Sequence, residues 1–201
     1  MNLLIKPANP QGKGVVGVLD SLQQAKKLLQ VKAKNIQQIS SELFTSLFVL
    51  NSEIRFKPTS KQTYWLYNKN NRYRLSLIAP EQWLPAKYGR FIGACELQID
   101  LTWTLELSYD CANDQAFIQE IAYQRLQLEE KMQHAEKLED VLPVYVETLP
   151  FYSRILASAL AYSLQQSMQK SGISGLSLQQ ANKLQTNQTE IVGLVSRHCP
   201  E

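Results

Sequence analysis

The sequence predicts an α+β fold in which a long N-terminal helix precedes a small antiparallel β-meander, about residues 54–107, and C-terminal helices pack on or beside the sheet. Three observations point to this class. Apolar residues recur at helical spacing before residue 50, alternate at strand spacing up to residue 107, and return to helical spacing from residue 114. With 201 residues and 44% apolar content, the chain is long enough to bury one substantial core.

The N-terminal part of the chain reads as an irregular arm followed by a helix. Residues 1–18 contain several prolines and glycines, which interrupt regular structure. Asp20 and Gln23 have the spacing of a capping box, and the apolar residues that follow stay on one helical face. Lys32 interrupts that face, and Val31–Asn35 is a candidate break. The pattern therefore predicts one long helix or two helices in series, ending near residue 50.

The first half of the predicted sheet is a hairpin. Thr63–Tyr67 is rich in residues with high strand propensity, and the returning strand begins at Arg72. Between them, Asn68–Asn71 is a predicted tight turn, because asparagine tolerates the left-handed backbone conformations that such turns need. Alternation places Tyr73 on the face opposite Arg72 and Arg74.

The second half of the predicted sheet, residues 91–107, alternates strictly between apolar and polar positions. Such a pattern is typical of a strand with one buried and one solvated face. The segment is much longer than the usual strand of about 5–6 residues. We therefore expect a bend, a bulge or two successive strands, with Gly93 as a candidate for the kink.

Helical spacing beyond the sheet predicts helices over 114–142 and 149–171, and a short final helix from Ser177. Arg125 interrupts the apolar face of the first helix. The predicted organisation is an irregular arm at 1–18, a single α+β domain at 19–185, and a loosely held tail at 186–201.

Composition and segment lengths favour a soluble cytoplasmic protein. The N-terminal apolar run is too short for a signal peptide, and the most apolar later run, Ile155–Leu164, is half the length of roughly 20 residues that a membrane helix needs. We therefore expect no membrane partner. The three cysteines form no close pair, which favours reduced thiols over a disulfide framework.

The charges are distributed unevenly along the chain. Residues 1–95 contain 14 Lys and Arg against 4 Asp and Glu, whereas residues 96–201 contain 7 against 14. The two halves can pack together and complement each other, or the charges can simply be solvated. The basic half can also present a surface to nucleic acid or another polyanion.

No catalytic, cofactor-binding or metal-binding constellation is apparent, so we expect a protein that is not an enzyme. The histidines, His134 and His198, lack a second ligand at metal spacing. Gly12–Gly17 has the spacing G-x-G-x-x-G before a helix, but Pro7 and Pro10 break the strand that a phosphate-binding loop requires. A nucleotide-dependent enzyme using this loop is the weakest functional hypothesis.

The predicted sheet interleaves basic and aromatic residues, and its strands supply a candidate interaction surface. The residues proposed for it are Trp65, Tyr67, Arg72, Arg74 and Trp83. The leading hypothesis is a binding module with an unknown protein partner. The alternative is binding of RNA or single-stranded DNA, in which rings stack on bases and cations follow the phosphates. The aromatic residues can equally well form the core, and the heptad-like helices can support oligomers.

Several segments of the sheet resemble a known family. Tyr64–Tyr67, Tyr73–Trp83, Phe91–Ala94 and Leu97–Thr104 are similar to a widespread family of uncharacterised proteins, found in bacteria and as a small human open-reading-frame product. The resemblance covers roughly residues 20–104. It implies no activity, cofactor or catalytic residue, because the family is a domain of unknown function.

Overall fold

The computed structural model describes residues 31–82, 88–144, 149 and 151–195. The chain divides into two units, residues 1–30 and residues 31–201, and the description below concerns the second. The predicted arm at 1–18 and the helix expected from Asp20 to residue 30 lie outside the described residues.

The first described helix, α2, covers Ile36–Leu50 and begins at a capping box. The side chain of Asn35 accepts a hydrogen bond from the Gln38 amide (2.8 Å), and the Gln38 side chain accepts one from the Asn35 amide (3.0 Å). These bonds satisfy amides that have no partner within the helix. Residues 31–35 are not helical, which confirms the predicted break at Val31–Asn35.

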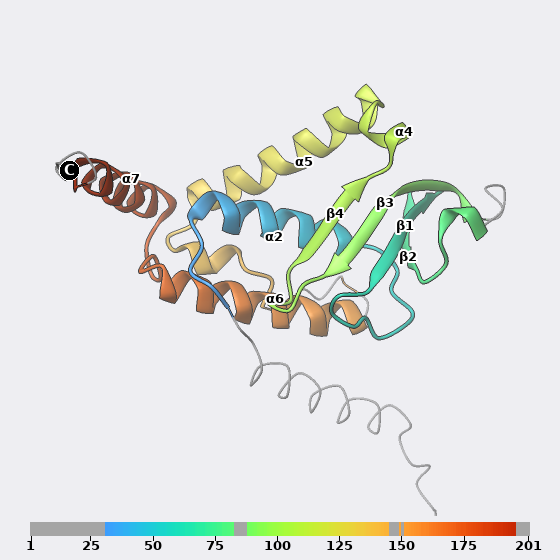
Figure 1. Cartoon of the computed structure of the whole chain (residues 1–201), viewed down its shortest axis with the longest axis horizontal. Helices are drawn as coiled ribbons and strands as arrows, with labels where there is room; N and C mark the ends of the chain where they lie inside the picture. The colour runs from blue at the N-terminus through green and yellow to red at the C-terminus, as the bar shows by residue number, and fades with distance from the viewer. Residues whose placement is uncertain (1–30, 83–87, 145–148, 150, 196–201) are drawn as a thin grey trace, which may run out of the picture. The chain divides into compact units, whose positions relative to one another are not determined.

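The sheet contains four strands: β1 (Thr63–Lys69), β2 (Arg72–Ser76), β3 (Arg90–Leu97) and β4 (Trp103–Leu107). Neighbouring strands are antiparallel, so the α+β class with an antiparallel sheet is confirmed (Figure 1). The spatial order is β2-β1-β3-β4. This order differs from a simple meander, because the connection from β2 to β3 passes β1, which pairs with both strands.

The β1–β2 hairpin closes through the predicted asparagine turn. Lys69 pairs with Arg72, so Asn70 and Asn71 form a two-residue loop. Their φ angles are 53° and 59°, as a type I′ turn requires at both positions. Asparagine reaches this left-handed region at lower cost than most residues, which explains its presence in a turn without glycine.

The alternating segment 91–107 forms two successive strands, the first of which contains a bulge, so two of the three expected outcomes occur together. The turn between them includes Leu101, whose φ is 66°, and Gln98 donates a backbone hydrogen bond to Thr102 (2.8 Å). A bulge in β3 leaves Ile92 as an extra residue opposite β1. The bulge lies directly before Gly93, the candidate for the kink, and a Cβ atom at Gly93 would lie 2.2 Å from the Glu106 carbonyl oxygen, so glycine also permits β3 and β4 to approach closely.

One face of the sheet packs against α2 and α6 (Phe151–Lys170), and this layer forms the core. Tyr64 and Trp103 are both almost fully buried there, with ring centroids 5.8 Å apart. The helices contribute small and branched side chains that let them approach the sheet. The most deeply buried of these are Ile39, Leu43, Leu50, Ala157, Leu160, Leu164 and Met168.

Residues 31–35, which we call the N-terminal strap, are fastened to the C-terminal part of α6. Three α6-proximal side chains donate hydrogen bonds to strap carbonyls: Ser167 to Lys32 (2.8 Å), Lys170 to Val31 (2.7 Å) and Ser171 to Lys34 (2.7 Å). Because Ser167 and Ser171 are four residues apart, they lie on one side of the helical segment. The N-terminal strap is thus held by hydrogen-bond donors at the C-terminal end of α6 and just after it.

The strap also carries a cation into a partly buried cluster. Lys34 Nζ lies 2.5 Å from Glu42 Oε2 and 2.5 Å from Asp100 Oδ2. Burial raises the pKa of Asp100, but hydrogen bonds from Lys34 and Thr102 outweigh it and lower the pKa below its usual value. The cluster connects the strap, α2 and the β3–β4 turn.

The helices after the sheet differ in length from the prediction. A short helix, α4 (Tyr109–Ala112), precedes α5 (Gln115–His134), which ends before the expected residue 142. Ala135 is extended, and the chain continues into the 3₁₀ turn η2 (Leu138–Val141). Leu138 is buried, and its amide donates a hydrogen bond to the Leu176 carbonyl (2.9 Å) instead of to a carbonyl of α5, so α5 does not continue through this residue.

The last described helix, α7 (Leu178–Val195), is longer than the short helix predicted from Ser177. Gly172, two residues after the end of α6, has a φ of 67°, as a left-handed helix stop requires. Among the described residues, no helix combines the length and apolarity needed to cross a lipid bilayer.

Candidate interaction site on the outer sheet face

The sheet face turned away from α2 and α6 carries the basic residues of the hairpin. On β1, Tyr64 and Leu66 point into the core, so Tyr67 and Lys69 project from the outer face. Register places Arg74 opposite Tyr67 and Arg72 opposite Lys69. The predicted alternation of β2 is therefore confirmed.

Tyr73, by contrast, belongs to the core side. Its ring packs edge-on against Phe48 of α2, with centroids 5.1 Å apart. This contact fixes the rotation of β2 about its axis, because a half-buried aromatic residue on one face forces its neighbours in sequence onto the other. Arg72 and Arg74 are both exposed as a result.

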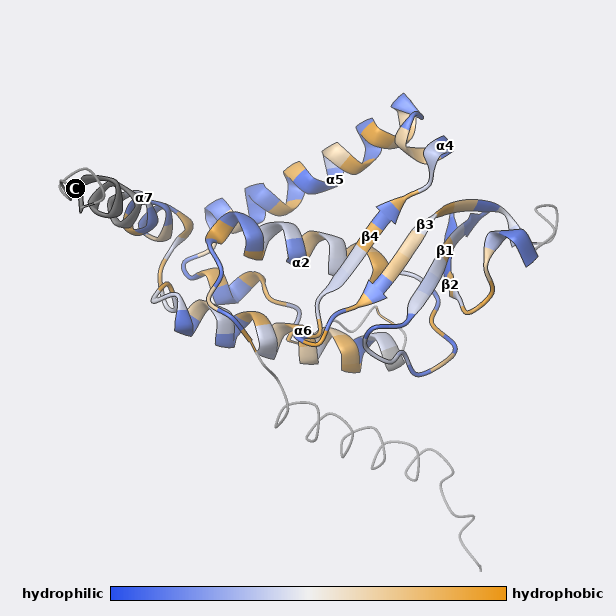
Figure 2. Ribbon diagram, in the orientation of Figure 1, coloured by the Kyte–Doolittle hydropathy of each residue, from blue (hydrophilic) through white to orange (hydrophobic). Residues whose placement is uncertain are grey.

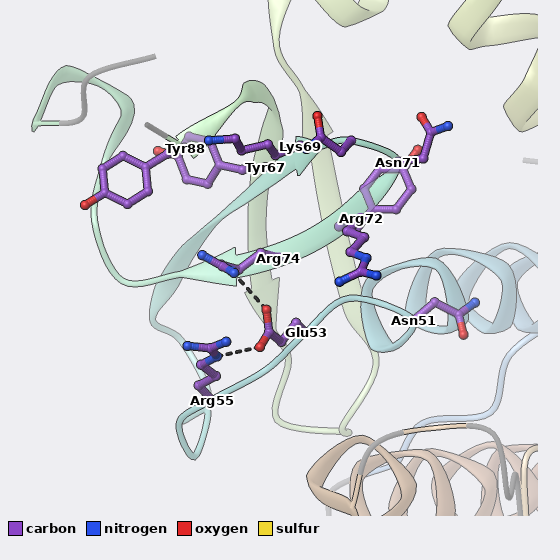
Figure 3. Close-up of a pocket in the computed structure, with 11 residues that line it drawn as sticks. Asn51, Glu53, Arg55, Tyr67, Lys69, Asn71, Arg72, Arg74 and Tyr88 are labelled. Carbon is purple, nitrogen blue, oxygen red and sulfur yellow. Dashed lines mark hydrogen bonds and ion pairs between the residues drawn. The ribbon is translucent and has the colours of Figure 1, made fainter. Parts of the chain in front are cut away.

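A hollow of about 740 Å³, which we call the basic groove, lies along the hairpin and the segment that follows α2 (Figure 3). Its walls come from three parts of the chain: the residues after α2, the β1–β2 hairpin, and Tyr88, two residues before β3. The lining residues are Asn51, Glu53, Arg55, Tyr67, Lys69, Asn70, Asn71, Arg72, Tyr73, Arg74 and Tyr88.

Glu53 organises one end of the basic groove. Its amide donates to the Tyr73 carbonyl (2.9 Å) and its carbonyl accepts from the Leu75 amide (3.1 Å), so it covers part of the outer edge of β2. Its carboxylate lies 2.5 Å from Arg55 and 3.0 Å from Arg74, which Figure 3 shows converging on it. The hydrogen bond from Arg55, followed by that from Arg74, lowers the pKa of Glu53.

The other end of the basic groove has an excess of positive charge. Lys69 and Arg72 are directly opposite each other in the register of the hairpin, and both side chains are exposed. In the part of the chain that the structure describes, no carboxylate forms an ion pair with Arg72. This end can therefore accept an anion.

Tyr67 forms the floor of the groove and not a platform above it. Its side chain is 3% exposed, its ring lies 5.6 Å from that of Phe91, and its hydroxyl donates to the Ile78 carbonyl (3.0 Å). Burial, followed by the charge of Glu81, raises the pKa of Tyr67 to about 12. The phenol therefore stays neutral throughout the physiological range.

Of the five residues predicted for an interaction surface, the structure brings three together. Tyr67, Arg72 and Arg74 line the groove; Trp65 is half-buried on the same sheet face but is not part of the lining. Trp83 lies outside the described residues. Sequence reasoning missed Asn51 and Glu53, because only the tertiary pairing of the segment after α2 with β2 brings them to the hairpin.

The groove contains cations, amides, phenols and a carboxylate that is already paired, so its chemistry suits the binding of an anion. Among the described residues, no three His, Cys, Asp or Glu side chains are grouped so that they could hold a metal ion. The Gly12–Gly17 loop and His198 lie outside the described residues, and the prediction for the loop stays a prediction.

These features define a small α+β protein with a basic groove along the β1–β2 hairpin of an antiparallel sheet. The chain belongs to the family described as protein of unknown function (DUF2452), which it matches over residues 15–134. No curated protein and no solved structure matches it. The match extends past the predicted residue 104, through α5, and ends before α6.

Proposed function

We propose that this protein is a non-enzymatic binding module that holds an acidic segment of a partner protein in the basic groove. The observation that carries the proposal is the exposed guanidinium of Arg72, which lines the groove beside Arg55 and Arg74 and forms no ion pair with a carboxylate of the described residues. A carboxylate of the partner that pairs with this guanidinium would accept two charge-assisted hydrogen bonds.

The aromatic residues support carboxylates as ligands over nucleic acid bases. Single-stranded nucleic acid is bound by exposed rings on which bases stack, and each stacked base contributes about 1–3 kcal/mol. Tyr67 is buried beneath the groove, and Tyr73 packs on the core side. The ring of Tyr67, which the sequence suggested for the interaction surface, is thus occupied within the fold, whereas Arg72 and Arg74 are exposed to solvent.

The test is binding of a fluorescent Glu- and Asp-rich peptide to the full chain, followed by polarisation, with a single-stranded oligonucleotide of equal charge in parallel. We expect the peptide to bind more tightly than the oligonucleotide, with affinity falling as salt rises. Arg72→Gln should weaken binding about two- to fivefold, because an exposed ion pair contributes about 0.4–1 kcal/mol.

Lys183→Gln is the matched control, since it removes the same charge from an exposed position on α7. It should leave the affinity for the peptide unchanged. Absence of peptide binding at about 50 mM salt, where surface charges are weakly screened, would refute the proposal. If the oligonucleotide binds more tightly than the peptide, and Arg72→Gln weakens its binding by the same two- to fivefold factor, the groove binds nucleic acid instead.

A further inference from the structure

The two edges of the sheet differ in how their backbone groups are bonded. At the outer edge of β2, the Glu53 amide donates to the Tyr73 carbonyl (2.9 Å) and the Glu53 carbonyl accepts from the Leu75 amide (3.1 Å). At the opposite edge, β4 pairs with β3 alone among the described strands, and α2 crosses behind it (Figure 1). A strand edge with unpaired amides and carbonyls can accept a further strand.

The bonds between β4 and β3 determine which backbone groups of β4 face outward. The Thr102 carbonyl accepts a hydrogen bond from the Gln98 amide (2.8 Å). The Ser108 amide donates one to the Ile92 carbonyl (2.7 Å). In an antiparallel pair, alternate residues bond to the partner strand, so the even-numbered residues of β4 face β3. The odd-numbered residues therefore direct their amides and carbonyls away from the sheet.

Two of the three outward-facing residues have unpaired backbone groups. Trp103 is the exception, because its amide donates to Ser46 Oγ of α2 (2.9 Å). The amides and carbonyls of Leu105 and Leu107 have no hydrogen-bond partner in the part of the chain that the structure describes. Both residues are only partly buried. The open part of the edge therefore extends from Leu105 to Leu107, and its backbone groups are spaced for pairing with an extended chain.

The outer face beside this open edge is acidic. Alternation places Thr104 and Glu106 on the outer face, because Trp103 is buried in the core, and the change of colour along β4 in Figure 2 reflects this alternation. A hollow of about 260 Å³ lies along this face, and Glu96 and Glu106 both line it beside Ala94. Neither glutamate belongs to an ion pair of the described residues. The hollow can therefore receive a long basic side chain.

The same residues disfavour a second copy of β4 as the added strand. In an antiparallel pair of β4 strands, Leu105 and Leu107 are both fully bonded only when Leu105 of each copy is opposite Leu107 of the other, because the Trp103 amide is already bonded to Ser46. That register places Glu106 directly opposite its counterpart, and like charges at such positions destabilise a sheet. A lysine or arginine opposite Glu106 would instead be favourable.

We propose that the open edge of β4 binds an extended segment of a partner protein, which becomes a fifth strand of the sheet. Its basic residues pair with Glu96 and Glu106 on the outer face. Its alternate residues are apolar and cover Leu105 and Leu107. In such complexes, backbone hydrogen bonds supply affinity and pockets for alternate side chains supply specificity. The edge shares no lining residue with the basic groove, and the inference does not rest on the function proposed for that groove.

Hydrogen exchange of the backbone amides of the full chain tests the proposal. The probe is a synthetic peptide of alternating valine and lysine, with a peptide of alternating valine and glutamate in parallel. When the valine–lysine peptide is present at about ten times its Kd, exchange at Leu105 and Leu107 should slow about tenfold, because only the unbound protein exchanges. The Trp103 amide is the internal control and should change little, since it is bonded to Ser46 without the peptide.

Substitutions test the choice of a basic segment. Glu106→Gln should weaken binding of the valine–lysine peptide about two- to fivefold, as the loss of one exposed ion pair predicts. Glu136→Gln is the matched control, because it removes the same charge from an exposed position after the end of α5. Arg72→Gln, in the basic groove, should also leave the affinity for this peptide unchanged.

Three results would overturn the proposal. The first is no binding of the valine–lysine peptide at about 50 mM salt, where surface charges are weakly screened, or binding that leaves exchange at Leu105 and Leu107 unchanged. The second is tighter binding of the valine–glutamate peptide. The third is slow exchange at these two amides that increases with protein concentration in the absence of peptide, which would assign the edge to a second copy of the chain.

Discussion

Replacing Lys34 tests the cluster that connects the N-terminal strap to the sheet. Lys34→Met keeps most of the aliphatic side chain but removes the ammonium group that lies 2.5 Å from both Glu42 and Asp100. Two carboxylates then face each other without a cation, and Asp100 loses one of the hydrogen bonds that keep it ionised. We expect the variant to fold with reduced stability.

The size of the effect follows from burial. Removing one partner of a fully buried ion pair costs about 3–5 kcal/mol. The side chains of Lys34, Asp100 and Glu42 are 11%, 17% and 30% exposed, so solvent screens part of the interaction. We therefore expect a loss of about 2–3 kcal/mol in the free energy of unfolding, which lowers the melting temperature by about 5–10 °C in a protein of this size.

The pH dependence has a defined sign. Because the pKa of Asp100 is lowered in the folded protein, its contribution is complete above the usual value of 3.8 and is lost as the pH falls through the lower folded value. The difference in the free energy of unfolding between the unmodified protein and Lys34→Met should therefore be largest near neutral pH. It should become smaller as the pH falls below 3.8.

Urea unfolding followed by circular dichroism measures the difference, with Lys32→Met as the control. Lys32 is an exposed lysine two positions earlier in the same strap. Its replacement should change the free energy of unfolding by no more than about 0.5 kcal/mol. If the two variants unfold at the same urea concentration, the cluster does not stabilise the strap.

Two further substitutions test the sheet. Gly93→Ala should lower the free energy of unfolding by about 3 kcal/mol, because the new Cβ would lie 2.2 Å from the Glu106 carbonyl oxygen. Gly175→Ala is the control: it has open space around it and should cost about 1 kcal/mol through its positive φ alone. Equal melting temperatures of the two variants would contradict the steric argument. Tyr67→Phe should lower the free energy of unfolding by about 1 kcal/mol, because it removes the hydrogen bond to the Ile78 carbonyl. In an ultraviolet titration it should also remove the tyrosine whose pKa is raised to about 12. An unchanged titration curve would refute the burial of this phenol.

Local rules account for the features that the sequence predicts well. The asparagine turn was predictable because a two-residue hairpin needs left-handed residues at both positions. The outward position of Arg72 and Arg74 followed from alternation, since one half-buried tyrosine between them fixes the parity of the strand. The break before α2 was predictable because Lys32 interrupts the apolar face; the capping box of Asn35 and Gln38, which fixes where α2 begins, is seen in the structure.

Features that depend on distant contacts were not predictable in the same way. The strand order requires pairing of β1 with β3, which no local pattern encodes. The end of α5 at His134 is set by a hydrogen bond from Leu138 to Leu176, although the apolar spacing continues past it. In the candidate site, Glu53 joins the groove only through its bonds to β2. Neither Leu138 nor Glu53 has a sequence pattern that would indicate these roles.

The bonds between the N-terminal strap and α6 have a consequence for folding during synthesis. They connect residues 135 to 139 positions apart, so the strap cannot be fastened until α6 has left the ribosome. At about 5–20 residues per second, the 63 residues from Leu107 to Lys170 take roughly 3–13 s to add. Throughout this interval the sheet is complete in sequence, but the face that α6 covers is open. The segment that matches the family, residues 15–134, is thus shorter than the unit that folds.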